Sequence, residues 1–164
     1  MKPSLSISAA LVVLACTSES PTPCPGVRVA TFRIETTPML ESFDCGFSPQ
    51  SRSIRATLAW DSADPDEGAI LCPEGTEALP LLGEHTGDHV TVSNRSEGVT
   101  LDACGSACSL SLEQTLEIDL VRDESGAVTG FAGLLRESLA ALMGCETTIC
   151  TLPCDVQYAV TGGL

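Results

Sequence analysis

The sequence predicts an all-β protein, an antiparallel meander that closes into a small barrel and is stabilised by disulfides. Three observations lead to this prediction. Several segments alternate strictly between apolar and polar residues, the turns between many of them are short, and nine cysteines occur in 164 residues. A β-sandwich with one or two crossover connections is the alternative that this pattern leaves open.

The segment 108–122 shows the clearest alternation. Its even-numbered positions from 108 to 120 are apolar except Gln114, and the odd-numbered positions are Ser, Glu, Thr or Asp. Successive side chains of a strand point to opposite faces, so this is the pattern of a half-buried strand. At roughly 3.3 Å per residue the run would extend about 50 Å, too long for a small domain. We therefore expect it to bend or break near Gln114.

The other strands are placed in order along the chain. Alternation predicts strands at 27–35, 54–60, 90–92, 99–103, 127–135 and 156–160, with weaker ones at 69–72 and 78–82. Turns are expected at 61–68, 94–98, 105–107 and 123–126. Gly130 and Gly133 indicate a bend or bulge, and residues 136–143 lose the alternation, which suggests a short helix or irregular backbone.

The composition restricts the core and the partners. Hydrophobic residues make up 43% of the chain but aromatics only 4%, so the core is expected to be aliphatic. The formal net charge of −14 repels nucleic acid and favours a basic or cationic partner.

The N-terminus has the features of an export signal. Lys2 is followed by the apolar run Leu5–Ala15, far shorter than the roughly 20 residues of a spanning helix, and it ends in Val13-Leu14-Ala15-Cys16. This ending resembles the lipobox of bacterial lipoproteins, and the resemblance covers residues 1–16 only. It implies that a peptidase cuts before Cys16 after lipid has been attached to its sulfur.

The chain is therefore expected to divide into three parts. These are a signal peptide (1–15), the lipidated Cys16 with a Pro-, Ser- and Thr-rich tether (16–26), and a single β domain (27–164). The lipid would anchor the protein to a membrane. Thr17 stands where an Asp would retain a lipoprotein at the inner membrane, which favours the outer membrane.

Lipidation of Cys16 leaves an even number of cysteines, which can form four disulfides. The connectivity cannot be deduced, because eight cysteines allow about 105 pairings. A bridge across the predicted hairpin from Cys104 to Cys108 is one candidate, and a zinc site made of Cys104, Cys108, Cys150 and Cys154 is the rival. Export favours disulfides, so we expect no metal. The disulfide candidates are Cys24, Cys45, Cys72, Cys104, Cys108, Cys145, Cys150 and Cys154.

Two groups of polar residues are candidate sites of chemistry. His85 and His89 are the only histidines, and glycines at 83 and 87 predict that they lie in a loop. The carboxylates at 61, 64, 66 and 67 superficially resemble a calcium loop, but their spacing does not fit an EF-hand, so a hydrated turn is expected. No catalytic motif, metal site or cofactor site is recognised.

These observations favour an envelope-anchored lipoprotein with a non-catalytic binding or structural domain. A lipocalin-like carrier of a small apolar ligand is one alternative, and it requires a hollow barrel. A secreted hydrolase is the other, and it requires a histidine, a carboxylate and a serine that converge only in the folded chain.

Overall fold

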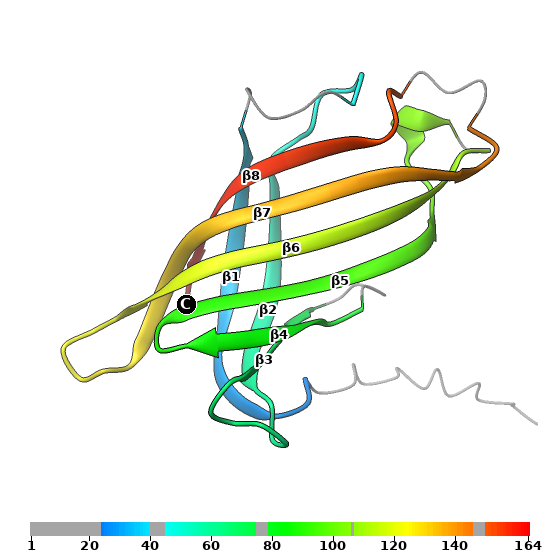
Figure 1. Ribbon diagram of the computed structural model, residues 1–164. Coiled ribbons are helices and arrows are strands. Elements are labelled where there is room, and N and C mark those ends of the chain that lie inside the picture. Colours follow the sequence, from blue (N-terminus) through cyan, green and yellow to red (C-terminus); the bar gives the residue numbers. More distant parts are fainter. Residues whose placement is uncertain (1–23, 40–44, 75–78, 106, 146–149) are drawn as a thin grey trace, which may run out of the picture.

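A computed structural model describes residues 24–39, 45–74, 79–105, 107–145 and 150–164 (Figure 1). Eight antiparallel strands form a closed barrel in sequence order, and β1 pairs with β8 to complete it. The predicted meander barrel is therefore confirmed, and the sandwich is excluded. The elements are β1 (Val27–Pro38), β2 (Arg52–Trp60), β3 (Gly68–Pro73), β4 (Leu81–Thr86), β5 (His89–Val99), the 3₁₀ turn η1 (Asp102–Cys104), β6 (Ser109–Arg122), β7 (Val128–Met143) and β8 (Cys154–Gly163).

The barrel interior is filled by the apolar rows that alternation predicted. Phe32 and Leu58 are fully buried, and the Phe32 ring meets Phe131 edge to face, with centroids 5.0 Å apart and an interplanar angle of 82°. Such pairs stabilise a core beyond the area that they bury. Trp60, at the end of β2, is partly buried and packs against this core.

The long strand β6 curves but does not break at Gln114, so of the expected bend or break the structure excludes the break. Its register with β7 runs without a shift from Leu110 to Val121, and irregularities occur only at the two ends. In a small barrel the strands tilt and coil around the axis, which allows a long strand to curve continuously. Figure 1 shows β6 and β7 as two long, curved neighbours.

Two further assignments were wrong. The expected turn at 94–98 lies inside the continuous strand β5, where Gly98 has a φ of 76° and the register with β6 shifts between Glu97 and Val99. A glycine with positive φ that interrupts a ladder is a bulge rather than a turn. The expected strand at 99–103 is replaced at its end by η1.

Residues 136–143 continue strand β7 and are not a helix. They pair with β6 as far as Met143 and with β8 as far as Leu139, so the ladders on both sides override the weak local pattern. Gly130 and Gly133, where a bend or bulge was expected, both lie inside strand β7, and at Gly133 the reason for glycine is the close approach of β6. A Cβ on Gly133 would lie 2.0 Å from the carbonyl oxygen of Glu117, a closer approach of two strands than any other residue permits.

The barrel has two different ends. The turn end holds the β2–β3, β4–β5 and β6–β7 connections, and the loop end holds the longer β1–β2, β5–β6 and β7–β8 connections together with β3–β4 (Figure 1). This distinction positions the features described below.

Candidate functional site

Every cysteine from Cys24 onward is in a disulfide, as predicted. Cys24 bonds to Cys72 and ties the segment before β1 to β3. The other three bonds lie at the loop end and connect the β1–β2, β5–β6 and β7–β8 regions into one covalent network. They join Cys45 to Cys154, Cys104 to Cys150 and Cys108 to Cys145.

The structure contradicts both local proposals for the cysteines around 104–108. Cys104 and Cys108 do not bridge each other, because η1 turns the chain away from a simple hairpin and brings Cys104 to Cys150 instead. The four thiolates of the rival zinc site are consumed in three disulfides. Among the residues that the structure describes, no group of three or more His, Cys, Asp and Glu could hold a metal ion.

Both histidines lie in strands, so their assignment to a loop was wrong. His85 is in β4, Gly87 and Asp88 form the tight turn, and His89 begins β5. Gly83 was read as a loop residue, but it sits inside β4. A Cβ there would lie 2.0 Å from the carbonyl oxygen of Thr91, which explains the glycine by close strand approach.

The histidines are not brought together on one face. The His85 ring stacks on Trp60 with centroids 3.9 Å apart, and its Nε2 lies 3.3 Å from the carbonyl oxygen of Pro65. His89 is on the outside, with Nδ1 2.9 Å from Oδ1 of Asp119. Each histidine therefore has its own separate partners, and the two do not assemble a catalytic pair.

The acidic segment 61–67 forms the β2–β3 connection, as predicted. Oδ1 of Asp61 accepts the backbone N–H of Ala63 at 2.9 Å, and the Asp61 N–H donates to the carbonyl of Gly68 at 2.9 Å. These contacts are those of a hydrogen-bonded turn.

Inside the barrel lies a polar group that sequence reasoning missed. We call Thr36, Arg52, Gln114, Glu137 and Tyr158 the interior polar cluster. Glu137 is only 7% exposed, and its two carboxylate oxygens accept from Arg52 Nη2 and Gln114 Nε2, each at 2.8 Å. The Arg52 guanidinium also lies 4.9 Å above the Tyr158 ring, and the backbone N–H of Arg52 donates to Thr36 Oγ1 at 3.0 Å.

The charged groups of the interior polar cluster are paired with each other: the Glu137 carboxylate is paired with the Arg52 guanidinium. Burial alone would lower the pKa of Arg52, but the Glu137 carboxylate outweighs it and leaves the pKa above its ordinary value. Burial and the charge of Glu137 raise the pKa of Tyr158. A buried carboxylate is tolerated when it is paired and hydrogen-bonded in this way. Gln114, the one polar residue in the apolar row of 108–120, was the available sequence signal.

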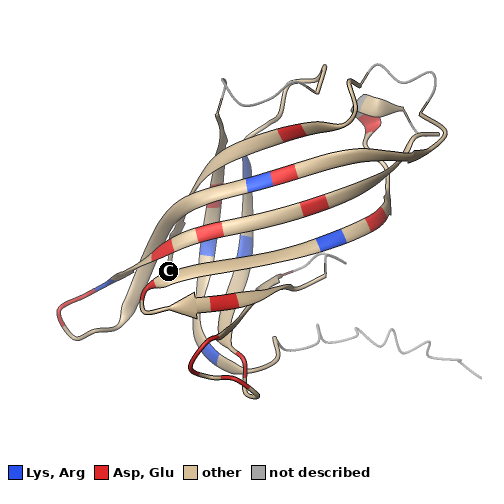
Figure 2. Cartoon of the chain, in the orientation of Figure 1, with Lys and Arg blue, Asp and Glu red and all other residues tan. Residues whose placement is uncertain are grey.

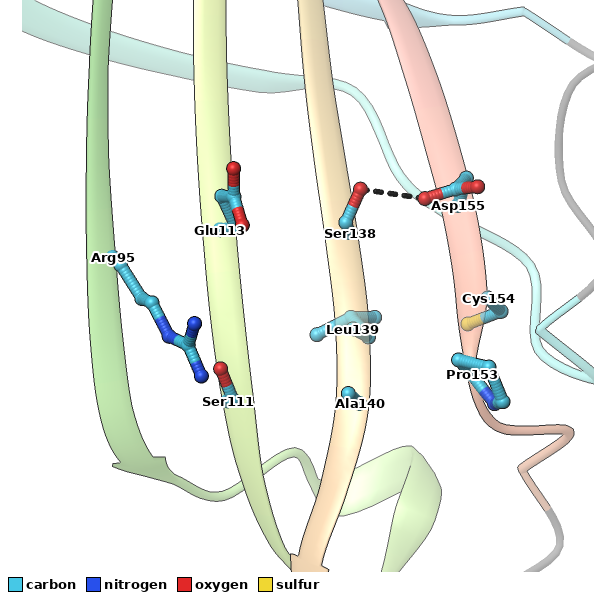
Figure 3. Close-up of a pocket in the computed structure, with 9 residues that line it drawn as sticks. All are labelled: Arg95, Ser111, Glu113, Ser138, Leu139, Ala140, Pro153, Cys154 and Asp155. Atoms are coloured by element: carbon cyan, nitrogen blue, oxygen red, sulfur yellow. Dashed lines mark hydrogen bonds between the residues drawn. The ribbon is translucent and has the colours of Figure 1, made fainter.

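On the outside, a shallow hollow of about 220 Å³ opens on the wall formed by β5 to β8 (Figure 3). Part of its lining is a single cross-strand row, because Arg95 pairs with Glu113, Glu113 with Ser138, and Ser138 with Asp155. Ser138 Oγ donates to Asp155 Oδ1 at 2.5 Å. We call it the outer hollow; it is lined by Arg95, Ser111, Glu113, Ser138, Leu139, Ala140, Pro153, Cys154 and Asp155.

The surface charge is mainly negative. Figure 2 shows acidic residues (red) on several strands and in connections of the turn end, with fewer basic residues (blue) among them. Several carboxylates have an arginine partner, such as Asp88 with Arg122 at 2.6 Å and Glu35 with Arg33 at 2.9 Å. With 22 acidic and 8 basic residues, many carboxylates remain without a cation of this chain.

No family model, no curated protein and no solved structure matches this chain. The predicted lipidation site, Cys16, lies outside the described residues, as does most of the tether. In the described part of the chain, no helix has both the length and the apolar character needed to cross a bilayer.

Proposed function

We propose that this chain is an envelope-anchored lipoprotein whose barrel is a non-catalytic binding module for a basic or cationic partner. The observation that carries the proposal is the loop end, where three disulfides join connections from three hairpins. Loops held on a rigid barrel are common sites of recognition, and restricting their motion lowers the entropic cost of binding. The described connections of the turn end contain no cysteine, and the fourth disulfide, Cys24 to Cys72, ties the segment before β1 to β3 instead of joining connections.

Charge supports a basic partner. The net charge of −14 attracts cations over the whole surface and speeds their encounter. Near the loop end, the outer hollow adds the exposed carboxylates of Glu113 and Asp155. The partner would therefore meet the loop end and the adjoining wall of β5 to β8.

The two alternatives have less support. An apolar carrier needs interior space, but the large side chains of Phe32, Leu58, Leu110 and Ile118 occupy the barrel and are fully buried. A hydrolase needs a positioned base, but His85 faces Trp60 whereas His89 contacts Asp119 on the outside.

The test is site-specific photo-crosslinking in native envelopes. A photoreactive residue replaces Thr151 at the loop end, and the matched control carries it at Glu124 in the β6–β7 turn; both positions are exposed. We expect a discrete adduct with a basic protein from position 151 only, weakened as salt rises because exposed charges are screened. An adduct from position 124 without one from 151 would contradict the proposal.

An activity panel tests the rival enzyme. The full chain and its His85→Ala and His89→Ala variants are assayed together against ester, peptide and glycoside substrates. We expect no turnover above background. Turnover that one of these two substitutions abolishes would replace the binding module with a hydrolase.

A further inference from the structure

We propose that the outer surface of β1, β2 and β3, which we call the anchor face, lies against the anionic headgroups of the membrane that holds the lipid. The inference rests on the proposed function, because it requires the lipid at Cys16. It goes further by naming the side of the barrel that meets the membrane. Two observations support it: the place where the tether joins the barrel, and the distribution of charge around the barrel.

The tether joins the barrel at the anchor face. The disulfide from Cys24 to Cys72 attaches the tether to β3, and Cys24 Sγ lies 3.6 Å from the carbonyl oxygen of Thr57 on β2. Residues 17–23 alone separate Cys24 from Cys16, so this part of the chain spans at most about 28 Å even when fully extended. Strand β6, with 14 residues, is about 46 Å long. A lipid at Cys16 would therefore hold the barrel close to the membrane.

Two arginines lie beside this attachment point. Cys72 pairs with Thr57, and Arg55 lies two residues before Thr57 on the same outer surface of β2. In the register, Arg55 pairs with Arg33 of β1, and the side chains of Arg33 and Arg55 are 72% and 69% exposed. Residues two apart on a strand point to the same face and lie about 7 Å apart. The arginine pair and the attachment point of the tether therefore share one small area of the anchor face.

The charge of the barrel surface is distributed unequally. Besides Arg33 and Arg55, β1 exposes Arg28, for which the described residues provide no ion-pair partner. Two carboxylates accompany these arginines, Glu35 at 2.9 Å from Arg33 and Glu74 at 3.5 Å from Arg55. On the wall of β5 to β8 the carboxylates instead outnumber the arginines (Figure 2). The outward-facing carboxylates there are Glu97, Glu113, Glu117, Asp119 and Asp155, and the arginines are Arg95, Arg122 and Arg136.

A negatively charged membrane surface discriminates between these two sides. The short tether keeps the barrel near the surface, so the preferred orientation is the one in which the side next to the membrane is repelled least. Exposed charges are screened beyond about 8 Å at physiological ionic strength, so the charges on that side dominate. The membrane therefore repels the wall of β5 to β8 and accepts the anchor face, where guanidinium groups can bind headgroup phosphates.

This orientation leaves the opposite wall free for the partner. In the closed barrel of eight strands, β1 lies across from β5 and β2 across from β6 (Figure 1). With the anchor face on the membrane, the acidic wall of β5 to β8 points away from the surface. The lipid anchor and the arginine pair would then act together to present that wall to a basic partner.

The experiment measures how close two sides of the barrel lie to the membrane. The full chain, extracted from membranes with its lipid and its disulfides intact, is placed in vesicles of equal parts phosphatidylcholine and phosphatidylglycerol that contain a lipid with a spin-labelled headgroup. A fluorescent residue replaces Ser53 in β2, and the matched control carries it at Ser93 in β5; both positions are exposed. We expect the spin label to quench position 53 about threefold more strongly than position 93. Equal quenching, or stronger quenching at position 93, would overturn the inference.

Neutral vesicles and paired variants test the role of charge. In phosphatidylcholine alone, quenching at the two positions should agree within about 1.5-fold, and a difference that persists there would overturn the recognition of anionic headgroups. In the mixed vesicles, Arg33→Gln with Arg55→Gln should reduce the threefold difference to about the same 1.5-fold limit. Arg95→Gln with Arg136→Gln removes the same charge from the wall of β5 to β8 and should leave a difference of at least about threefold. Equal losses in both double variants would overturn the inference, because they would indicate an effect of net charge alone.

Flotation of the vesicles separates this inference from the proposed function. A chain that does not float with the vesicles has no anchor, so the proposed lipoprotein fails and the membrane contact of the anchor face fails with it. A chain that floats but is quenched equally at positions 53 and 93 keeps its anchor, so only the contact of the anchor face fails. Far-ultraviolet circular dichroism confirms that each variant is folded.

Discussion

At the scale of single residues, Glu137 shows how this barrel tolerates a charge among aliphatic side chains. Both of its oxygens are occupied, one by Arg52 and the other by Gln114, each at 2.8 Å. The side chain of Arg52 is 47% exposed, so the pair is partly hydrated and its desolvation cost is reduced. The interior polar cluster is therefore a structural network, with its polar groups directed at one another rather than at a ligand.

The only tyrosine reports on this cluster. Burial and the Glu137 charge raise the pKa of Tyr158, so its phenolate absorbance should appear at a higher pH than that of free tyrosine, about 10. Because the pKa of Tyr158 is higher in the folded state, its protonated phenol stabilises the fold fully at pH values below the unfolded-state pKa. That stabilisation is lost as the pH rises through the folded-state pKa. Glu137→Gln should bring the midpoint back toward about 10. A midpoint at or below that of free tyrosine in the unaltered chain would contradict the geometry.

Two adjacent glycines provide a matched pair of packing variants. A Cβ on Gly162 would lie 2.2 Å from the Phe131 ring, whereas one on Gly163 would meet nothing within 4 Å. Gly162→Ala should displace Phe131 from its edge-to-face contact with Phe32 and lower the free energy of unfolding by about 1–3 kcal/mol. Gly163→Ala should change it by less than about 0.5 kcal/mol. Denaturant unfolding measures both, and equal stabilities of the two variants would contradict the packing.

At the scale of elements, predicted and observed strands differ at glycines, because glycine occurs both in turns and inside strands. Gly98 and Gly83 were read as turn and loop residues, yet one marks a bulge within β5 and the other a close strand contact within β4. Local sequence cannot separate these uses, because the difference lies in the neighbouring strand. By contrast, β6 was identified because its alternation is an intrinsic property of one half-buried strand.

The pairing of the disulfides is a direct test of element positions. Non-reducing proteolysis followed by mass spectrometry should recover Cys104 with Cys150 and Cys108 with Cys145, and denatured protein should show no reactive thiol from Cys24 onward. Each bond should contribute about 2–4 kcal/mol. A peptide that links Cys104 to Cys108 would contradict the structure at η1.

At the scale of the whole molecule, the barrel was predictable and the candidate sites were not. Alternation with short turns is enough to indicate an antiparallel meander. The outer hollow depends on the register, which brings Glu113, Ser138 and Asp155 side by side from three strands. The pairing of Glu137 with Arg52 crosses the barrel between residues far apart in the sequence, and composition contains no information about such a contact.

The anchoring of the molecule is tested by its mass. If the lipobox resemblance holds, the mature chain extracted from membranes should begin at Cys16 and carry acyl chains. Two chains are needed for stable attachment, because one gives only marginal binding. Cys16→Ala should leave an unprocessed or soluble form. A mature chain that starts beyond Cys16 would exclude lipidation at this position.

The pairing of β1 with β8, which is the seam that closes the barrel, affects how the protein behaves when it is partly unfolded. The first and last strands pair as far as Pro38 and Tyr158, and just beyond them Cys45 and Cys154 are joined with Cα atoms 5.2 Å apart. Loss of the seam hydrogen bonds would therefore not separate these strands. Strand exchange between two copies requires a terminal strand to leave its own barrel, and exposed strand edges are the usual template for aggregation. The covalent link opposes both, so reduction should be needed before copies of this chain can exchange β8.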